Sequence, residues 1–319
     1  MKLSVALCTF NGASFLPAQL DSLRTQSRLP DELIVCDDAS CDNTLSLCRD
    51  FANLAPFPVR IVSNSTNLGS TKNFEQAVSL CTGDVILPCD QDDVWQPNKL
   101  ARIHREFELN PSLGLTFSDA WLATPDLVRT GRRAWQVLPF TPKMQRAFDA
   151  GTGPELLLRY NVVSGATLAF RADLRNVLLP IPAKWVHDAW IGFLAASVSE
   201  VRTIPEPLIV YRQHPEQQIG ISRRTLSRQL RAAFTRIDAA YYDAIADRFS
   251  ELAYRLEQLG DNPILAAIRE KAAFARDQSR MREQHRIRRA WTATRHLAAG
   301  RYHRFAHGLR SFAVDVLLK

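Results

Sequence analysis

Three carboxylates within four residues at the end of an apolar run are the chemically most distinctive feature of the sequence. Residues 85–87 predict a buried strand, and Asp90, Asp92 and Asp93 follow it. Side chains at i and i+2 of an extended segment point the same way, so Asp90 and Asp92 can converge on one point beyond the strand. Two carboxylates suit Mg²⁺ or Mn²⁺, which such oxygens hold together with substrate phosphates and water. The alternative is a solvated acidic turn before a helix that starts near Pro97.

Strands and helices alternate along the first part of the chain. The strand candidates are residues 2–10, 33–36, 59–62, 85–87 and 113–117, and apolar residues at helical spacing lie between them. This alternation predicts an α/β fold whose mostly parallel sheet is covered by helices. Open parallel sheets bind ligands at the carboxyl ends of their strands. Three strands end in the polar segments 9–11, 37–38 and 90–92, which together indicate a site.

The pattern beyond residue 120 is less regular, and residues 120–150 show no clear elements. The predicted elements that follow are a strand-like stretch at 162–167, a helix at 188–198, and strands at 201–204 and 208–211. From Ser222 the sequence changes to long helical patterns. We therefore predict one α/β domain over residues 1–221 and a basic helical extension over residues 222–319.

Composition excludes several classes of protein. All six cysteines lie in the first 89 residues and none forms a CxxC pair, which argues against a disulfide framework or a zinc site. No apolar stretch reaches the roughly 18 residues of a spanning helix. The apolar N-terminal run is too short for a signal sequence. We expect a cytoplasmic protein.

Taken together, these residues resemble the family 2 glycosyltransferases with the GT-A fold, over about residues 1–221. The resemblance rests on the segments 6–12, 37–44, 67–69, 83–84 and 90–93, which occur in the order and at the spacing of that family. The sequence is most similar to bacterial rhamnosyltransferases that build cell-surface polysaccharides. This closer similarity rests on the segments 89–95, 164–167 and 211–214.

The resemblance implies a role for each matching residue. The residues implied to bind the donor nucleotide are Thr9, Asn11, Asp37, Asp38, Asn67, Gly69, Lys72 and Asp90. The residues implied to bind the metal, Mg²⁺ or Mn²⁺, are Asp90, Asp92 and His214. Those implied to bind the acceptor are Ser164, Gly165 and Trp190. Asp188 matches the catalytic base. Many relatives have Glu-Asp there, whereas this chain has His187 before Asp188, and a base at His187 would displace that assignment.

The chemistry implied is a single in-line displacement with inversion at the anomeric carbon. A cation acts as Lewis acid and template for the departing nucleoside diphosphate. A carboxylate in hydrogen-bond reach removes the proton of the attacking sugar hydroxyl. The implied reaction moves L-rhamnose from dTDP-L-rhamnose to a lipid-linked cell-surface polysaccharide or O-antigen acceptor.

Three alternatives remain open. The donor could be a UDP-hexose, with the same chemistry. The protein could be a non-catalytic nucleotide-sugar-binding or scaffold protein, against which the intact set of Asp90, Asp92 and Asp188 speaks. A nucleotidyltransferase would require a glycine-rich phosphate loop near the first strand, where the sequence offers only Asn11 and Gly12.

The charge is concentrated near the C-terminus. Residues 222–319 hold 20 of the 40 Lys and Arg but only 10 of the 33 Asp and Glu. In the runs 286–291 and 301–305 basic and aromatic residues alternate, which suits the headgroup region of an anionic membrane. The enzyme would then lie on the inner face of the plasma membrane. No nucleic-acid motif is present, so no nucleic-acid partner is expected. The other alternative is a helical packing or oligomerisation segment.

Overall fold

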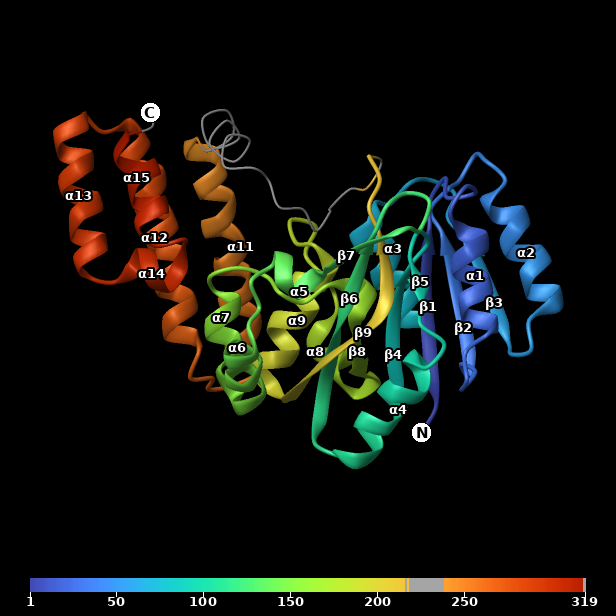
Figure 1. The fold of residues 1–319 in the computed structure, drawn as a ribbon. Coiled ribbons are helices and arrows are strands. Elements are labelled where there is room, and N and C mark those ends of the chain that lie inside the picture. The colour runs from blue at the N-terminus through green and yellow to red at the C-terminus, as the bar shows by residue number, and fades with distance from the viewer. Residues whose placement is uncertain (216, 218–237, 318–319) are drawn as a thin grey trace. The chain divides into compact units, whose positions relative to one another are not determined.

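The computed structural model describes residues 1–215, 217 and 238–317 (Figure 1). The chain divides into two compact units. Unit 1 comprises Met1–Gly151 and Val162–Ile221, and unit 2 comprises Thr152–Asn161 and Ser222–Lys319.

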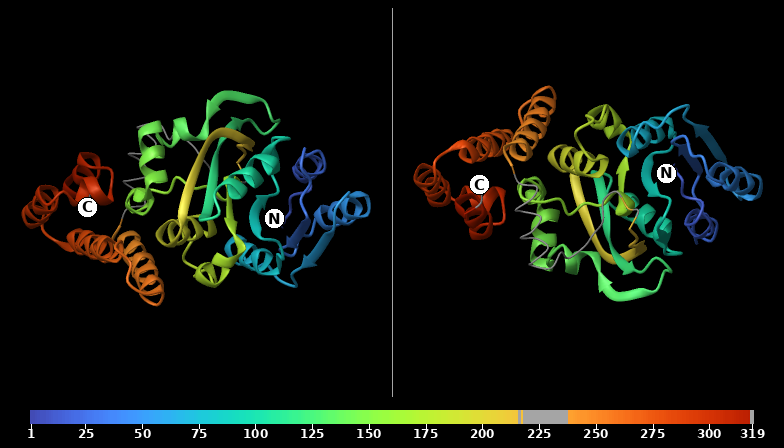
Figure 2. Two further views of the ribbon diagram at one scale, coloured as in Figure 1. Left: turned by 90° about the horizontal axis from the view of Figure 1, so that it is seen from below. Right: turned by 90° about the horizontal axis from the view of Figure 1, so that it is seen from above.

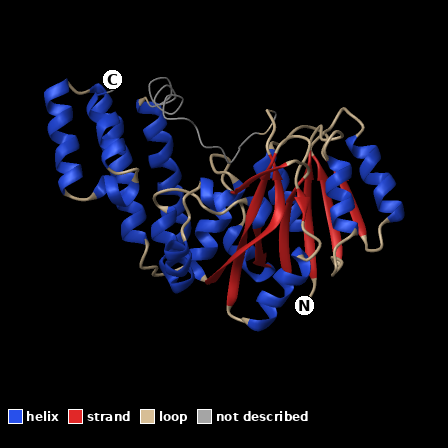
Figure 3. Cartoon of the chain, in the orientation of Figure 1, coloured by secondary structure: helices blue, strands red, loops and turns tan. Residues whose placement is uncertain are grey.

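Unit 1 is built on one nine-stranded mixed sheet (Figure 3). The strands are β1 (Leu3–Thr9), β2 (Glu32–Asp37), β3 (Val59–Ser63), β4 (Val85–Asp90), β5 (Val94–Trp95), β6 (Leu113–Ala123), β7 (Arg129–Arg133), β8 (Leu168–Arg171) and β9 (Glu200–Arg212). Their order is β3-β2-β1-β4-β8-β6-β9-β5, with β7 paired to β6. Neighbours β3, β2, β1 and β4 are parallel, as are β6 and β9, whereas β5, β7 and β8 pair antiparallel. Four pairings are thus parallel and four antiparallel, but the parallel ladders are longer, so most paired residues of the sheet are in parallel register.

Helices cover both faces of this sheet (Figure 2). They are α1 (Leu16–Arg24), α2 (Thr44–Leu54), α3 (Ser70–Leu80), α4 (Lys99–Leu109), α5 (Ala134–Val137), α6 (Pro142–Ala147), α8 (Arg175–Leu178) and α9 (His187–Val198). In α4 the buried apolar residues are Leu100, Ile103 and Phe107, spaced so that they form one stripe toward the core. Strand β1 is buried along its whole length because both of its faces are covered, and it therefore shows no alternation of apolar and polar residues.

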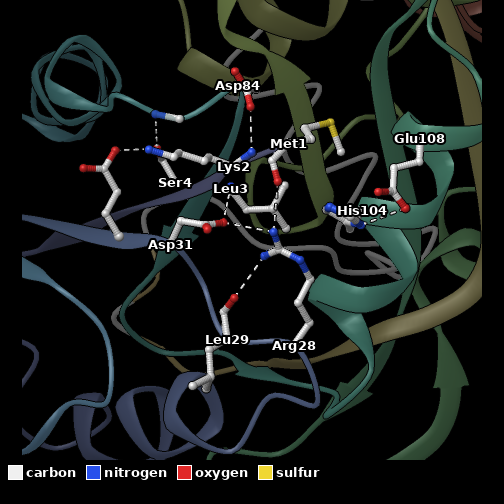
Figure 4. Close-up of polar contacts among 12 residues, drawn as sticks. Met1, Lys2, Leu3, Ser4, Arg28, Leu29, Asp31, Asp84, His104 and Glu108 are labelled. Atoms are coloured by element: carbon white, nitrogen blue, oxygen red, sulfur yellow. Dashed lines mark hydrogen bonds and ion pairs between the residues drawn. The ribbon is translucent and has the colours of Figure 1, made fainter.

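The amino end of β1 is fixed by two carboxylates (Figure 4). The backbone N–H of Lys2 donates to Asp84 at 2.6 Å, and that of Leu3 donates to Asp31 at 2.7 Å. Arg28 also binds Asp31, at 2.9 Å. These bonds hold the strand in register, so that its carboxyl end lies at the opposite edge of the sheet.

Three expectations about single elements need correction. Residues 201–204 and 208–211 belong to one strand, β9, which accommodates its two prolines by shifts of register against β6 between residues 118 and 120. The stretch 162–167 is not a strand: it ends in a 3-10 turn at Gly165–Thr167, and β8 begins only at Leu168. The unassigned stretch 120–150 contains the end of β6, β7, α5 and α6.

The cysteines are all free thiols. Five are buried in unit 1, as expected for small apolar residues, but Cys41 is exposed in the loop after β2. Cys41 is therefore not part of the core.

Unit 2 is helical within its described residues. Its helices are α7 (Gly153–Leu157), α11 (Ala239–Glu257), α12 (Leu265–Glu283), α13 (Arg286–Ala298), α14 (Arg301–Phe305) and α15 (Leu309–Leu317). Helices α11 and α12 pack along each other, and Gly260, with φ of 110°, lies in the break between them. None of the helices in the described part of the chain has the length and apolar character needed to cross a bilayer.

A buried carboxylate joins the helices of unit 2. Asp315 is 1% exposed and accepts hydrogen bonds from Tyr242, Gln278 and Tyr302 at 2.7–2.8 Å. Arg282 forms an ion pair with it at 2.7 Å. The network connects α11, α12, α14 and α15.

Replacement of this carboxylate should destabilise unit 2. Asp315→Asn leaves the buried Arg282 cation without its counter-charge, which costs about 3–5 kcal/mol when one partner of a buried pair is removed. Chemical denaturation followed by far-ultraviolet circular dichroism would measure this loss. The exposed Asp243→Asn on α11 is the matched control and should change stability by less than about 0.5 kcal/mol. Equal stability of the two variants would contradict the role of the network.

Candidate active site

The polar strand ends that the sequence singles out lie at one edge of the sheet. Strands β1 and β4 are parallel neighbours, and Cys8 pairs in register with Asp90. From β1 the chain proceeds to β2 and β3 on one side, whereas β4 lies on the other, so the sheet order reverses between β1 and β4. Ligands of open parallel sheets bind at such a reversal. Thr9 and Asp90 are the last residues of the two strands that flank it.

The loops after β1 and β2 are bonded to each other. Thr9 Oγ1 donates to Asp37 at 2.7 Å, and the same carboxylate accepts from the backbone N–H and the hydroxyl of Ser40. Asn11 accepts from the N–H of Cys41 at 2.9 Å. Asn11 has φ of 45°, a left-handed conformation that Asn tolerates better than most residues. The predicted nucleotide residues thus form one connected rim.

Asp38 continues the rim to the loop after β3. Its carboxylate accepts from the backbone N–H groups of Leu68 and Gly69 at 2.8 and 2.9 Å and from Asn64 at 2.9 Å. Asn67 donates to the Asp38 carbonyl at 3.4 Å. Asp38 is only 2% exposed, so its oxygens shape the Asn67–Gly69 turn from within.

Gln91 connects this rim to the acidic turn. Its side-chain oxygen accepts from the N–H of Phe10 at 2.9 Å, and its side-chain nitrogen donates to the Phe10 carbonyl at 3.0 Å. A Cβ on Gly12 would overlap the Gln91 amide, so a side chain at that position would require Gln91 to move. The residue between the two predicted metal ligands thus binds the backbone of the nucleotide loop at two points.

The acidic turn gathers negative charge in a small volume. Burial raises the pKa of Asp90, and the carboxylates of Asp92 and Asp188 raise it further. Asp93 is 1% exposed, and its pKa is raised by burial and then by Asp92 and Asp90. Asp188 is therefore close enough to interact electrostatically with the turn, although 98 residues separate it from Asp90 in sequence.

Lys99 lies buried beside these carboxylates. Its ammonium donates to the carbonyl of Ala166 at 2.6 Å and lies 3.7 Å from the centre of the Trp95 ring. Burial lowers its pKa to about 7, while Cys89, Asp93 and Asp90 act in the opposite direction. Lys99 thus ties the Gly165–Thr167 turn to the segment that follows the acidic turn.

The end of β9 supports the acidic turn from the other direction. The Arg212 side chain donates from Nε to the Asp92 carbonyl at 2.7 Å, and the backbone N–H of Arg212 donates to the Asp93 carboxylate at 3.1 Å. His214 Nε2 lies 2.8 Å from the Asp92 carboxylate, and its ring packs against Phe15 in a tilted arrangement, with centroids 4.3 Å apart. The structure brings the predicted Asp92 and His214 into direct contact.

Asp188 lies in the first turn of α9, against the predicted acceptor loop. The N–H of Gly165 donates to its Oδ2 at 3.2 Å. Burial raises the Asp188 pKa to about 6, although the N–H groups of Gly165 and Ala189 lower it. A Cβ on Gly165 would lie 2.5 Å from His187 Nε2, so this close approach requires glycine. Ser164 precedes it and is partly exposed.

His187 is an unsuitable alternative base. It is 6% exposed, and its ring stacks on Phe74 with centroids 3.9 Å apart. Burial lowers its pKa to about 3, so the ring is neutral and sits in the core side of α9. The geometry therefore favours Asp188 over His187.

Two predicted binding residues are engaged elsewhere. Trp190 is 1% exposed and its Nε1 donates to the Leu178 carbonyl at 2.7 Å, so the prediction that it contacts an acceptor is not supported. The Lys72 ammonium binds Glu75 and the Ile181 carbonyl, each at 2.8 Å, rather than the rim or the acidic turn.

Sequence reasoning missed Gln91, Lys99 and Arg212. Gln91 and Arg212 lie within the segments 90–93 and 211–214, on which the family resemblance rests. Their place in these segments was the only indication of a role. Lys99 gave none, because a lysine at the start of an amphipathic helix is usually solvated.

The acidic turn does not form a complete metal site by itself. Among residues 1–215, 217 and 238–317, no group of three or more His, Cys, Asp or Glu is arranged to hold a metal ion. A cation at Asp90 and Asp92 would need further ligands from a substrate or water. Oxygen donors with spare coordination positions are the usual setting for Mg²⁺.

Comparison with known proteins gives a family match for part of the chain. Residues 4–148 match the family model described as Glycosyl transferase family 2. An uncharacterised glycosyltransferase of Nostoc sp. is 28% identical over 217 residues, which cover 67% of this chain and 65% of that protein. The dTDP-rhamnosyl transferase RfbG of Shigella flexneri is 25% identical over 224 residues, covering 67% of this chain and 73% of RfbG. The match thus spans slightly less than two thirds of the Nostoc relative.

The fold is shared with a solved structure. S. aureus TarS in complex with UDP-GlcNAc superposes with a TM-score of 0.60 at 16% identity, covering 88% of this chain and 90% of the TarS chain. At this identity the likeness concerns the fold, and it confirms the predicted GT-A type of α/β sheet with a helical C-terminal region. The family match includes the nucleotide rim and the acidic turn, whereas Asp188 and His214 lie outside residues 4–148.

Proposed function

We propose that this chain is a metal-dependent, inverting glycosyltransferase with Asp188 as its catalytic base. The observation that carries the proposal is the link between Asp188 and the acidic turn: the Gly165 N–H donates to Asp188, and Lys99, which is buried beside the turn, donates to the Ala166 carbonyl of the same loop. A displacement needs a base on one side of the sugar and charge stabilisation on the other. Asp188 and the Asp90–Asp92 pair provide carboxylates from two different elements for these two tasks.

The cation of the reaction would be Mg²⁺ or Mn²⁺, held by Asp90 and Asp92. His214 lies against Asp92 and orients that carboxylate or joins it as a ligand. Bound there, the ion supplies charge stabilisation for the departing diphosphate. The chain's own part is to fix the two carboxylates, which Arg212 does through the Asp92 carbonyl and Gln91 through the backbone of Phe10.

The donor would be a nucleoside diphosphate sugar, with dTDP-L-rhamnose as the leading candidate. The rim of Thr9, Asn11, Asp37 and Asp38 would receive the base and ribose. The named activity of the relative RfbG supports the rhamnosyl donor. A UDP-hexose would use the same carboxylates, and a non-catalytic nucleotide-sugar-binding protein would retain the rim without turnover.

The acceptor would be a lipid-linked saccharide of a cell-surface polysaccharide. The Ser164–Gly165 loop lies against Asp188, so a hydroxyl bound there would be within reach of the base. A pKa of about 6 leaves Asp188 mostly ionised at neutral pH and able to accept the proton. The enzyme would work at the inner face of the plasma membrane, where such acceptors are assembled.

Nucleotide binding should depend on the metal and on Asp92. In calorimetric and thermal-shift titrations of dTDP, UDP and GDP with and without Mn²⁺, dTDP should bind most tightly, and ligand at 100 times its Kd should stabilise the protein by about 2.7 kcal/mol. Asp92→Asn should remove the Mn²⁺-dependent part, whereas the exposed Asp50→Asn should bind like wild type. A preference for UDP would change the donor, and no binding of any of the three would overturn the enzymatic proposal.

Asp188→Asn should retain donor binding but lose turnover by about 10²–10⁴-fold, the usual contribution of a general base. Since the base must be deprotonated and its pKa is about 6, kcat/KM of the wild type should fall as pH decreases through that value. Initial rates between pH 5 and 8 with a soluble acceptor analogue would measure both effects. An active Asp188→Asn enzyme, or a flat pH profile below 6, would exclude this base.

Gln91→Ala should weaken binding of the nucleoside diphosphate by about 5–30-fold, because two hydrogen bonds of about 1 kcal/mol each fix the nucleotide loop against the metal turn. Gln91→Met keeps the length of the side chain and loses both hydrogen bonds without adding charge, so its affinity should be close to that of the alanine variant. Calorimetry with dTDP and Mn²⁺ would measure the series. Wild-type affinity of the alanine variant would show that the loop holds its position unaided.

A further inference from the structure

The structure treats the two basic and aromatic runs of unit 2 differently. In residues 301–305 the tyrosine and phenylalanine rings are buried, and Arg301 and Arg304 pair with Glu270 at 3.1 and 2.8 Å. That run is therefore engaged in holding unit 2 together. The run 286–291 begins α13 and leaves its large apolar side chains in solvent.

The outer face of α13 combines exposed apolar and cationic side chains. Ile287 is 77% exposed and Trp291 62% exposed. Ile287, Trp291 and Arg295 follow one another at intervals of four residues, so they lie along one stripe of the helix. The Arg295 guanidinium lies 4.8 Å from the centre of the Trp291 ring, and Arg288 is exposed beside the stripe. We call these four residues the outer face of α13.

The opposite face of α13 fixes the orientation of the helix. Arg289, Ala293 and His296 are buried there. Arg289 donates to the Val316 carbonyl of α15 at 3.0 Å, and the His296 ring packs edge-on against Phe274 of α12, with centroids 5.1 Å apart. The outer face is therefore held outward by contacts within unit 2 alone.

The segment that contains α13 carries charge of one sign in its own sequence. Between Glu283 and Asp315 the sequence contains seven arginines and no acidic residue. Among the residues that the structure describes, no carboxylate forms an ion pair with Arg288 or Arg295 of the outer face. An exposed cationic surface that also presents Trp and Ile complements a surface with negative charge outside and hydrocarbon beneath.

We propose that the outer face of α13 docks on an anionic lipid bilayer. The stripe is confined to one side of the helix, so α13 would lie parallel to the membrane with Trp291 and Ile287 below the headgroups and the arginines among the phosphates. This inference rests on the proposed function in one respect: docking on a membrane would bring the enzyme to its lipid-linked acceptor. A nucleic acid would use the arginines but would leave Ile287 exposed.

Tryptophan fluorescence offers a direct test with the full chain. Trp95, Trp135, Trp185 and Trp190 are buried and Trp121 is partly covered, so Trp291 is the most exposed of the six tryptophans. Vesicles of phosphatidylcholine with and without phosphatidylglycerol, carrying brominated acyl chains, are the probe. Quenching and a blue shift should occur only when phosphatidylglycerol is present. Trp291→Phe should remove the quenching while most vesicle binding persists in co-sedimentation.

Substitutions on the outer face should separate its two components. Arg288→Gln and Arg295→Gln should each weaken binding about fivefold, and Ile287→Ser with Trp291→Ser should abolish insertion. Tyr254→Ser on α11, which removes an aromatic side chain of 64% exposure, is the matched control and should bind like wild type. Absence of phosphatidylglycerol-dependent binding by wild type, or equal binding by all variants, would overturn the proposal.

Two further measurements keep the interpretation unambiguous. Binding to a duplex DNA oligonucleotide without quenching by brominated lipid would assign the basic face to nucleic acid and overturn the proposal. Transfer to a soluble acceptor analogue should be unchanged in the Ile287→Ser, Trp291→Ser variant. Vesicle binding without any response to nucleotides would refute the enzymatic proposal and leave the docking face intact.

Discussion

Crowding of buried carboxylates at the carboxyl end of β4 is the constraint on which the rest of the site depends. Burial raises the pKa of Asp90 and of Asp93, and neighbouring carboxylates raise both further: Asp92 and Asp188 act on Asp90, and Asp92 and Asp90 act on Asp93. Such a cluster persists only if its members are held by other groups. Three groups do this: Lys99, Arg212 at the end of β9, and the loop after β1, which Gln91 binds. Each of them comes from a different part of the sequence.

The supports rely largely on backbone atoms, which explains what the sequence could predict. The alternation of strands and helices gives the sheet, and the spacing of Asp90 and Asp92 gives the turn, because both follow from local periodicity. Resemblance to a family supplied Asp188 and the rim. Gln91 binds the N–H and carbonyl of Phe10, and Lys99 binds the carbonyl of Ala166. Every residue has a carbonyl group, so such contacts cannot be predicted from the residue types of a distant segment.

Burial decided the cases in which similar patterns had different outcomes. Trp190 matches a predicted acceptor contact, yet the apolar side of α9 turns it into the core. The two arginine-rich runs of unit 2 read alike, but one supplies core rings to unit 2 and the other presents its ring to solvent. Periodicity alone does not distinguish them, since each is amphipathic and only tertiary packing selects which face is covered. Pro205 and Pro207 likewise suggested a strand break that a register shift in β9 accommodates.

The bond between the Gly165 N–H and Asp188 would, in the proposed enzyme, separate catalysis from acceptor recognition. The proposed base is oriented by a main-chain donor, and a Cβ at position 165 would lie 2.5 Å from His187 Nε2. Ser164, in contrast, is partly exposed. Changes in acceptor choice would therefore fall on the residues around Gly165, while the orientation of Asp188 would be retained.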